Sequence, residues 1–210
     1  MRGARRTAAT IATRGLSPAL ARYYQVKGVR TGRHPTFAGL PIISQLTAGQ
    51  IQLGDDVKLV STALMSPLGS WGPCVLRCMN ATASIEIGDD CGFTGAVIVA
   101  RNRIRLGRRV MLGPGVVITD SDHHPLLPVE RRYLPAPEPD PRDDVTIGDD
   151  VFIGVRSTVL PGVTIGAGSV IGAGSTVVHS IPAGVVAGGS PARVLRDLAV
   201  AAPPADAQVS

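Results

Sequence analysis

The sequence predicts an all-β fold, a parallel β-helix built from six-residue repeats. Between Val145 and Ala192 an aliphatic residue returns at every sixth position, and glycine follows four of these six: Ile147, Ile153, Val159, Ile165, Ile171 and Val177. A period of six fits neither a single amphipathic strand nor a helix, whereas short strands joined by tight turns and stacked in coils produce it. Aromatic residues make up only 3% of the chain, so the core is expected to hold small aliphatic side chains in a narrow prism.

The residues between the aliphatic positions fit the turns of such a coil. A second small or β-branched side chain is expected to point inward two positions before the next aliphatic residue: Val151, Ser157, Val163 and Ser169. Gly-Asp-Asp and Gly-Ala-Gly sequences supply residues that tolerate positive φ or bond the local backbone. Three hexads make one coil, and stacking the coils at about 4.8 Å gives a core roughly 25–35 Å long.

A basic leader over residues 1–40 is expected before the repeats. The first 54 residues hold no Asp or Glu and eight basic side chains: Arg2, Arg5, Arg6, Arg14, Arg22, Lys27, Arg30 and Arg33. Leu16–Tyr24 is the best helical candidate. Three interpretations stay open, namely a helix at a membrane surface, an organellar presequence, and a helix packed on the domain. No aromatic platform or nucleic-acid motif accompanies the charge, so a nucleic-acid partner is not expected.

The β-helix domain is predicted to span residues 41–198. Its first hexad begins at Leu53, and the stretch 61–73, which contains Gly, Ser and Pro, is expected to loop out of the coil. The repeats return at Ile87 and are interrupted again over residues 119–144. That longer excursion contains two of the four histidines, so it is the first place to search for chemistry.

The end of the domain is predicted to close the prism as a short C-terminal helix within 191–198, and residues 199–210 are expected to form a disordered tail. Ser157–Ala192 contains no charged side chain, but Gly and Pro recur through it, which argues against a transmembrane helix. The three cysteines lack zinc-ribbon spacing, Cys91 falls in the inward register, and no secretory h-region is present. A reduced cytoplasmic chain is expected, with the leader at the inner membrane face as a further option.

Two segments resemble those of the hexapeptide-repeat acyltransferases. Asp120–Arg132 reads DSDHHPLLPVERR, and Val145–Leu195 combines the repeats with a GSPAR ending. The most similar branch holds the maltose and galactoside O-acetyltransferases and the bacterial polysaccharide O-acetyltransferases. The resemblance covers about residues 40–198. It implies a left-handed coil, a homotrimer with active sites between subunits, and acetyl-CoA as the acyl donor.

His124 aligns with the catalytic histidine of that family, which precedes Pro and Leu in an HPL motif. Acyl transfer from a thioester to a hydroxyl needs a base that removes the hydroxyl proton, and the ordinary pKa of histidine suits that role. The resemblance therefore implies that His124 activates an acceptor hydroxyl for direct attack on the acyl-CoA carbonyl, while a hydrogen-bond donor stabilises the oxyanion.

Four further residues of the excursion are candidates for support. His123 competes with His124 for the catalytic role, although a structural role is the simpler expectation. Asp120 or Asp122 could orient an imidazole, and a turn-forming role explains either aspartate equally well. Arg131 matches an arginine that often follows HPL in the family, and it could anchor the loop or contact substrate.

The resemblance also places acyl-CoA beside the C-terminal coils. Carried over by position, its contacts fall on Val155, Ala173, Val178, His179, Arg193 and Arg196. Small side chains would let the pantetheine arm approach the backbone, and the two arginines offer charge for phosphate. His179 stands where relatives often have Lys, and Phe152 stands where sugar acetyltransferases often carry Trp.

The acceptor is expected to be a sugar or glycan, but its identity does not transfer. The acceptor-binding Asn and acidic residue of the galactoside enzymes fall near Phe93 and Arg101 here. Arg101 belongs to a basic cluster that is most simply a solvated face, with an anionic acceptor as the sharper option: Arg101, Arg103, Arg105, Arg108 and Arg109.

Two other functions remain as alternatives. A γ-type carbonic anhydrase uses a related β-helix with three histidines on zinc, but His34, His123, His124 and His179 do not reproduce its spacing, so no metal is expected. A non-catalytic scaffold is the second alternative, and the His-Pro-Leu loop and GSPAR ending argue against it.

Overall fold

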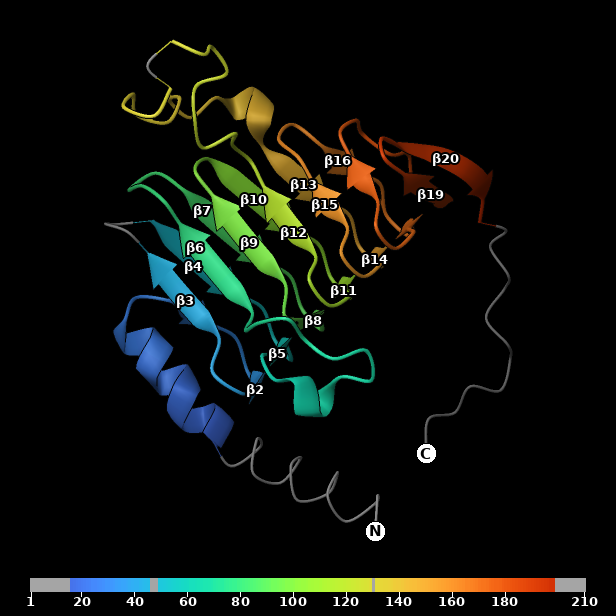
Figure 1. Ribbon diagram of the computed structural model, residues 1–210. Coiled ribbons are helices and arrows are strands. Elements are labelled where there is room, and N and C mark those ends of the chain that lie inside the picture. Colours follow the sequence, from blue (N-terminus) through green and yellow to red (C-terminus); the bar gives the residue numbers. More distant parts are fainter. Residues whose placement is uncertain (1–15, 46–48, 130, 199–210) are drawn as a thin grey trace.

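The computed structural model describes residues 16–45, 49–129 and 131–198, which form one three-sided prism (Figure 1). Strands of successive coils stack in register along each side, and every strand pair except the last is parallel. The fold is the left-handed parallel β-helix that the repeats and the resemblance predict. Within the described residues, no helix is long and apolar enough to span a membrane.

Each coil visits three sheets in turn, named A, B and C. Sheet A has six strands: β1 (Arg30–Thr31), β4 (Gln50–Leu53), β7 (Ser84–Ile87), β10 (Arg103–Leu106), β13 (Val145–Ile147) and β16 (Thr164–Ile165). Sheet B has eight: β2 (Thr36–Ala38), β5 (Lys58–Val60), β8 (Gly92–Thr94), β11 (Met111–Leu112), β14 (Phe152–Ile153), β17 (Val170–Ile171), β19 (Val185–Gly189) and β20 (Ala192–Asp197). Sheet C has six: β3 (Ile42–Gln45), β6 (Val75–Cys78), β9 (Val97–Ala100), β12 (Val117–Thr119), β15 (Thr158–Val159) and β18 (Thr176–Val177). The corners are called A–B, B–C and C–A after the sheets that they join.

The predicted inward residues fill the prism. All six aliphatic repeat positions and their four small partners are at most 1% exposed. Cys91 is buried in the same register, and burial raises the pKa of its thiol to about 11. The inward hydroxyls find partners on the next coil, as buried polar groups require. Ser169 Oγ, for example, donates to the carbonyl of Pro182 at 2.7 Å.

Two stretches leave the prism between strands, and Figure 1 shows them projecting from different parts of it. The shorter excursion, residues 61–74, leaves the B–C corner between β5 and β6 and contains the 3₁₀ helix η1 (Ala63–Met65). The longer excursion, residues 120–144, leaves the C–A corner between β12 and β13 and contains the 3₁₀ helix η2 (Pro141–Asp143). The candidate catalytic residues therefore lie on a loop that interrupts one corner of a continuous scaffold.

The described part of the leader begins with a helix that packs on the first coil. Residues 16–26 are helical, and Tyr24 within them is 5% exposed. The Tyr24 hydroxyl donates to the Pro41 carbonyl at 2.6 Å, and its ring lies 5.6 Å from that of Phe37. Strands β1 and β2 lie inside the predicted leader, so the coils start earlier than residue 41. Residues 1–15 fall outside the described residues.

The expected C-terminal helix is wrong. Ala192–Asp197 form strand β20, which turns back and pairs antiparallel with β19. The last coil leaves backbone N–H and C=O groups of β19 open at the sheet edge, and a returning strand satisfies them where a helix would not. Of the β20 side chains only Ala192 is buried, so backbone pairing rather than core packing selects the strand. The predicted tail, residues 199–210, lies outside the described residues.

Candidate active site

The longer excursion is fastened to the coils on both sides of it. On one side, the Asn102 side-chain amide donates to the carbonyl of Asp140 at 2.8 Å and to the carboxylate of Asp144. On the other side, the backbone N–H of Gly162 donates to the carbonyl of Asp143 at 2.9 Å. These contacts fix the returning limb of the loop, so the prism determines where the loop stands.

Asp120 anchors the outgoing limb. Its side chain is buried and accepts the backbone N–H groups of Arg101 at 2.7 Å and Asn102 at 2.9 Å. Burial raises the pKa of this carboxyl above its ordinary value, and the two backbone donors oppose that rise. Within the described residues, no hydrogen bond joins Asp120 to either histidine, so its observed role is to bond the backbone of the preceding coil. The Arg101 guanidinium also donates to the Pro137 carbonyl at 3.1 Å.

His123 is held against the end of β12. Its Nε2 lies 2.9 Å from Thr119 Oγ1, and its backbone N–H donates to Ser121 Oγ at 3.1 Å. The residue adopts a φ of 61°, the left-handed region that non-glycine residues seldom occupy. Burial, followed by the charges of Arg101 and His124, lowers the pKa of His123 below its ordinary value. The His123 ring is therefore neutral at physiological pH and already engaged.

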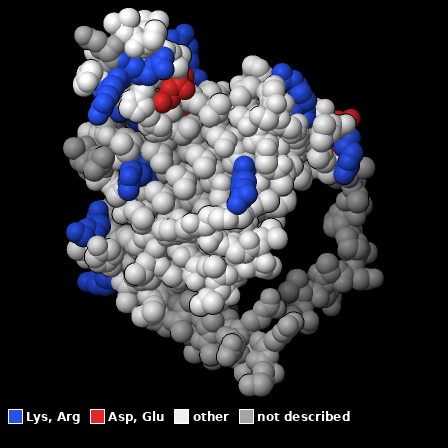
Figure 2. All heavy atoms as spheres, in the orientation of Figure 1, with Lys and Arg blue, Asp and Glu red and all other residues white. Residues whose placement is uncertain are grey.

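His124 faces solvent and forms part of the wall of an open hollow. The hollow has a volume of about 520 Å³ and is lined by His124, Pro128, Arg131, Arg132 and Tyr133. In Figure 2, basic side chains gather over this loop. The Arg131 guanidinium donates to the Leu126 carbonyl, so its observed contact braces the loop from within. Of the two histidines, His124 is the one with a ring exposed to an incoming substrate.

Asp122 lies beside His123 rather than in the wall of that hollow. It is exposed and borders, with Arg101 and Glu138, a cavity of about 50 Å³ under the loop. Its negative charge opposes the depression of the His123 pKa. Asp122 thus acts on His123 through its charge, and within the described residues its carboxylate accepts no hydrogen bond.

The predicted CoA residues fall into separate groups on one chain. Val155 and Ala173 stack directly at the B–C corner, where Gly174 N–H donates to the Val155 carbonyl at 2.8 Å. Val178 and His179 follow β18 at the C–A corner, the corner that the longer excursion also leaves. Two further positions, Arg193 and Arg196, lie exposed on β20. The first pair forms a small-residue track, and sheet C separates it from the second pair.

Sequence reasoning missed three residues that hold this site: Arg101, Asn102 and Thr119. It placed Arg101 in a solvated cluster, yet the Nε of this guanidinium is buried, and no described residue accepts its hydrogen bond. The available signal was the extra residue that interrupts the repeats near Arg103, because the loop is fastened at that point of the C–A corner. A side chain that supports a loop leaves no periodic trace in a sequence.

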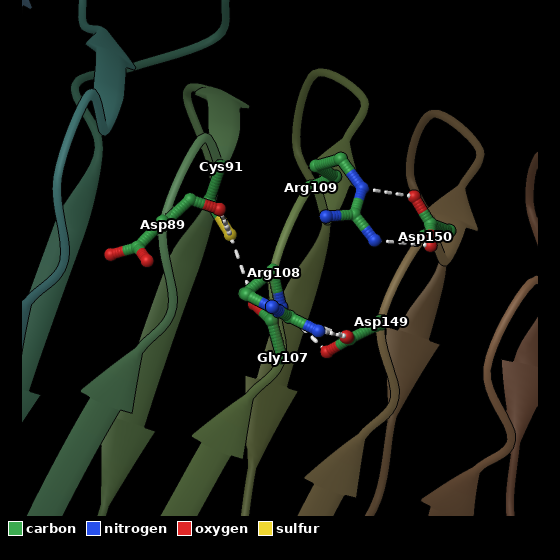
Figure 3. Close-up of polar contacts among 7 residues, drawn as sticks. All are labelled: Asp89, Cys91, Gly107, Arg108, Arg109, Asp149 and Asp150. Atoms are coloured by element: carbon green, nitrogen blue, oxygen red, sulfur yellow. Dashed lines mark hydrogen bonds and ion pairs between the residues drawn. The ribbon is translucent and has the colours of Figure 1, made fainter.

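The other arginines of the basic cluster form ion pairs with acids on neighbouring coils. Their pairs, of which Figure 3 shows the last two, are Arg103 and Arg105 with Glu86, Arg108 with Asp149 at 2.9 Å, and Arg109 with Asp150 at 2.6 Å. Arg108 and Arg109 lie over the Gly-Asp-Asp turn of the next coil, which contains Asp149 and Asp150. These four residues form a solvated, ion-paired face, in which Arg103 and Arg105 share the single carboxylate of Glu86.

Comparisons with known proteins agree with this architecture. The family described as "Bacterial transferase hexapeptide (six repeats)" matches residues 144–179. Nodulation protein L of Rhizobium meliloti is 39% identical over 149 residues, which cover 68% of this chain and 78% of that protein. Protein CapG of Staphylococcus aureus is 37% identical over 121 residues, which cover 54% of this chain and 66% of that protein. The chain spans 53%, 66% and 57% of the lengths of the first curated relatives that it matches.

Solved structures share the fold. A hexapeptide-repeat containing acetyltransferase from Vibrio cholerae is 33% identical with a TM-score of 0.50, over 60% of this chain and 70% of that one. AntD, an N-acyltransferase from Bacillus cereus in complex with dTDP and 3-hydroxybutyryl-CoA, has a TM-score of 0.64 at 16% identity, over 85% and 88%. A galactoside acetyltransferase in complex with coenzyme A has a TM-score of 0.51 at 24% identity, over 82% and 67%.

Proposed function

This chain belongs to the hexapeptide-repeat acyltransferases, and from that premise we propose that it is an acyl-CoA-dependent O-acetyltransferase acting on a sugar or polysaccharide hydroxyl. The observation that carries the proposal is the placement of His124. An exposed imidazole borders a hollow of about 520 Å³, on a loop that two neighbouring coils fasten. Such a loop can hold a base steady while leaving room for substrates.

In the proposed reaction, His124 takes the proton of the acceptor hydroxyl as its oxygen attacks the thioester carbonyl. The C–S bond then breaks, the acetyl group stays on the acceptor oxygen, and the CoA thiolate takes up the proton. His123 is engaged with Thr119 and has a depressed pKa, so it is the weaker candidate for the base. Its role in the proposal is to fix the direction of the loop backbone from which His124 projects.

The acetyl-CoA donor is proposed to lie along the B–C corner over Val155 and Ala173, with its phosphates toward Arg193 and Arg196. Gly154 supports this path, because its missing side chain lets successive turns stack closely: a Cβ at Gly154 would lie 2.6 Å from the Ala173 nitrogen. Val178 and His179 stand at the far edge of sheet C, so we assign their proposed contacts to a donor held between two subunits.

A homotrimer is proposed, with active sites between subunits. The outer face of sheet A is charged, but sheet C presents a ladder of apolar side chains in register: Ile42, Val75, Val97 and Val117. Ile42 is 44% exposed in the single chain, and an apolar row of this kind favours a protein contact over solvent. We assign this ladder to the subunit interface, and we keep cytoplasmic location, with leader contact at the inner membrane face, as part of the proposal.

Release of free thiol from acetyl-CoA in the presence of a panel of sugars tests the proposed activity. We expect release that depends on the acceptor, together with an acetyl ester on the product by mass spectrometry. Amino sugars belong in the panel, because amide products would assign N-transfer instead. Absence of acetyl-CoA binding in calorimetry would favour the non-catalytic scaffold. Hydration of carbon dioxide by zinc-loaded protein would favour the carbonic-anhydrase-like metalloenzyme.

A further inference from the structure

The shorter excursion places Trp71 in a stacked but exposed position. The guanidinium carbon of Arg156 lies 4.0 Å from the centre of the Trp71 ring, the distance of a close cation–π contact. The Trp71 side chain is nevertheless 57% exposed. A tryptophan usually gains stability by burying its large apolar surface, so an aromatic ring that is stacked and left open suits contact with a ligand.

Two glycines of the prism leave space for this part of the loop. Gly95 and Gly115 lie beneath it on successive coils, with φ values of 51° and 71°. A Cβ at Gly95 would stand 2.4 Å from Ser70 Oγ and 2.9 Å from the Gly72 carbonyl, and a Cβ at Gly115 would stand 3.1 Å from Trp71 Cε3. A side chain at either position would displace the loop, so these two glycines of the prism help to determine the position of Trp71.

Arg156 differs from the arginines of the A–B corner. Those are paired with Asp149 and Asp150, whereas Arg156 forms no ion pair with any described residue. Its φ of 56° places it in the left-handed region at the B–C corner, where it supports the ring of Trp71. A guanidinium stacked on an aromatic ring keeps its in-plane N–H donors available, and those donors match a carboxylate or phosphate.

The Trp71–Arg156 stack lies next to the proposed path of the pantetheine arm. Arg156 directly follows Val155, the first residue of the proposed pantetheine path, whose phosphate end lies at Arg193. The thioester end of the donor would therefore point toward the Trp71–Arg156 stack. A hollow of about 390 Å³ on sheet B, with Met111 and Phe152 in its lining, reaches Gly113, two residues before the glycine under Trp71. Neither Trp71 nor Arg156 lines this hollow, which lies on the sheet B side of the corner where they stack.

We infer that Trp71 and Arg156 form the acceptor subsite, and that the acceptor is an anionic sugar. The apolar C–H face of the sugar ring rests on Trp71, and its carboxylate or phosphate accepts N–H donors of Arg156. This inference rests on the proposed acetyl transfer and narrows its substrate class. It also explains why Arg156, unlike Arg108 and Arg109, is left without an acidic partner among the described residues.

The chain contains one tryptophan among three tyrosines, so tryptophan emission, excited at a wavelength that tyrosine does not absorb, reports on this site. The full chain is titrated at constant ionic strength with glucuronate and glucose 6-phosphate, which separate carboxylate from phosphate recognition. Glucose supplies the ring without charge, and acetate and inorganic phosphate supply charge without a ring. We expect a saturable change in Trp71 emission with at least one anionic sugar, and affinities about tenfold weaker for glucose and for the ring-free anions.

Variants assign the effect to the stack. Arg156→Gln is expected to weaken binding of the anionic sugar about tenfold and to reduce its preference over glucose, while acetyl-CoA binding stays within about twofold. Trp71→Ala removes the fluorescence signal, so its weaker binding of the anionic sugar is measured by calorimetry. Trp71→Phe should restore part of the sugar affinity. Arg22→Gln, on the exposed side of the N-terminal helix, is the matched loss of one positive charge and should leave sugar binding unchanged.

Two results would overturn the inference. One is an emission change caused by CoA but by none of the sugars, which would assign the stack to the donor. The other is acetyl transfer to neutral sugars with unchanged kinetics in Arg156→Gln, which would leave the proposed function standing without this subsite. Saturable sugar binding by a chain that lacks acetyl-CoA binding and thiol release would instead refute the proposed function.

Discussion

At the scale of single residues, two adjacent histidines experience different surroundings. His123 contacts Thr119, is partly buried and has a lowered pKa, while the neighbouring His124 is exposed beside an open hollow. The left-handed φ of His123 turns the chain at this point, between two side chains that end in different surroundings. A histidine that is committed to a structural contact leaves its neighbour free for substrate, which is the basis for assigning the general base.

Replacing each histidine in turn tests this division of roles. His124→Ala should lower kcat about 10²–10⁴-fold, the usual contribution of a general base, without altering the melting temperature. His123→Ala should retain activity within about tenfold and lose stability instead. Initial rates of thiol release and thermal melts measure both. An inactive His123→Ala beside an active His124→Ala would reverse the assignment.

The lowered pKa of His123 has a signed effect on stability. Below the ordinary histidine pKa of about 6.5, the unfolded chain binds a proton that the folded ring resists, so acidification favours unfolding. Wild-type protein should therefore lose more stability than His123→Gln as the pH falls from about 7 to about 5, with no further difference above about 7. Thermal melts across this range provide the comparison, and parallel curves for the two proteins would contradict it.

At the scale of elements, the longer excursion depends on side chains of the preceding coil. Asn102 joins that coil to the returning limb, and Asp120 joins the outgoing limb to it. The loop itself exposes apolar side chains and offers little core of its own: Leu126, Leu127, Val129 and Tyr133. Its position therefore comes from a few polar contacts at its base rather than from packing at its tip.

Asn102→Ala should release the excursion while leaving the prism folded. The loss of its two hydrogen bonds, one of them to a carboxylate, should cost about 1–3 kcal/mol. Limited proteolysis should then cut within residues 120–144 several times faster than in the wild type. Gln25→Ala is the control, because it removes a side-chain amide that donates to Thr31 Oγ1 at 2.7 Å and makes no contact with the excursion or with the residues that anchor it. Equal cleavage rates in the two variants would remove Asn102 as the anchor.

At the scale of the whole molecule, the three faces of the prism differ in kind. Sheet A and its corner carry ion pairs, whereas sheet C presents the apolar ladder that we assign to a trimer. Figure 3 shows how the charged corner is internally compensated, with each arginine turned toward an aspartate of the next coil. A face whose charges are paired is stable in solvent, whereas an exposed apolar face favours contact with a neighbouring subunit.

Val97→Glu, in the middle of the sheet C ladder, should convert a trimer into monomers. The introduced carboxylate would be buried unpaired in the interface, which association does not tolerate. Thr146→Glu places the same change on the outer face of sheet A and should remain trimeric. Analytical ultracentrifugation measures the mass of each. A monomeric wild type with full activity would refute the trimer, and a trimeric Val97→Glu would place the interface elsewhere.

The periodic part of this protein was predictable, and the supporting part was not. The burial of Ile147 and Ser169 could be predicted, because each residue occupies an inward position that the six-residue repeat defines. Asn102 and Thr119 act through contacts to a loop whose path no repeat encodes. The closing strand β20 was mistaken for a helix because its sequence has too few buried positions to show a period, and its partner is the backbone of β19.

That closing strand also limits the growth of the fold. A parallel coil ends in an edge onto which another parallel strand, from the same kind of chain, could add without limit. By reversing direction, β20 covers the β19 edge and presents a new edge with exposed charged side chains at Arg193, Arg196 and Asp197. Copies of the prism consequently meet a mismatched, charged terminus instead of a template. A fold made of repeats thereby remains a discrete particle and is kept from extending into a fibre.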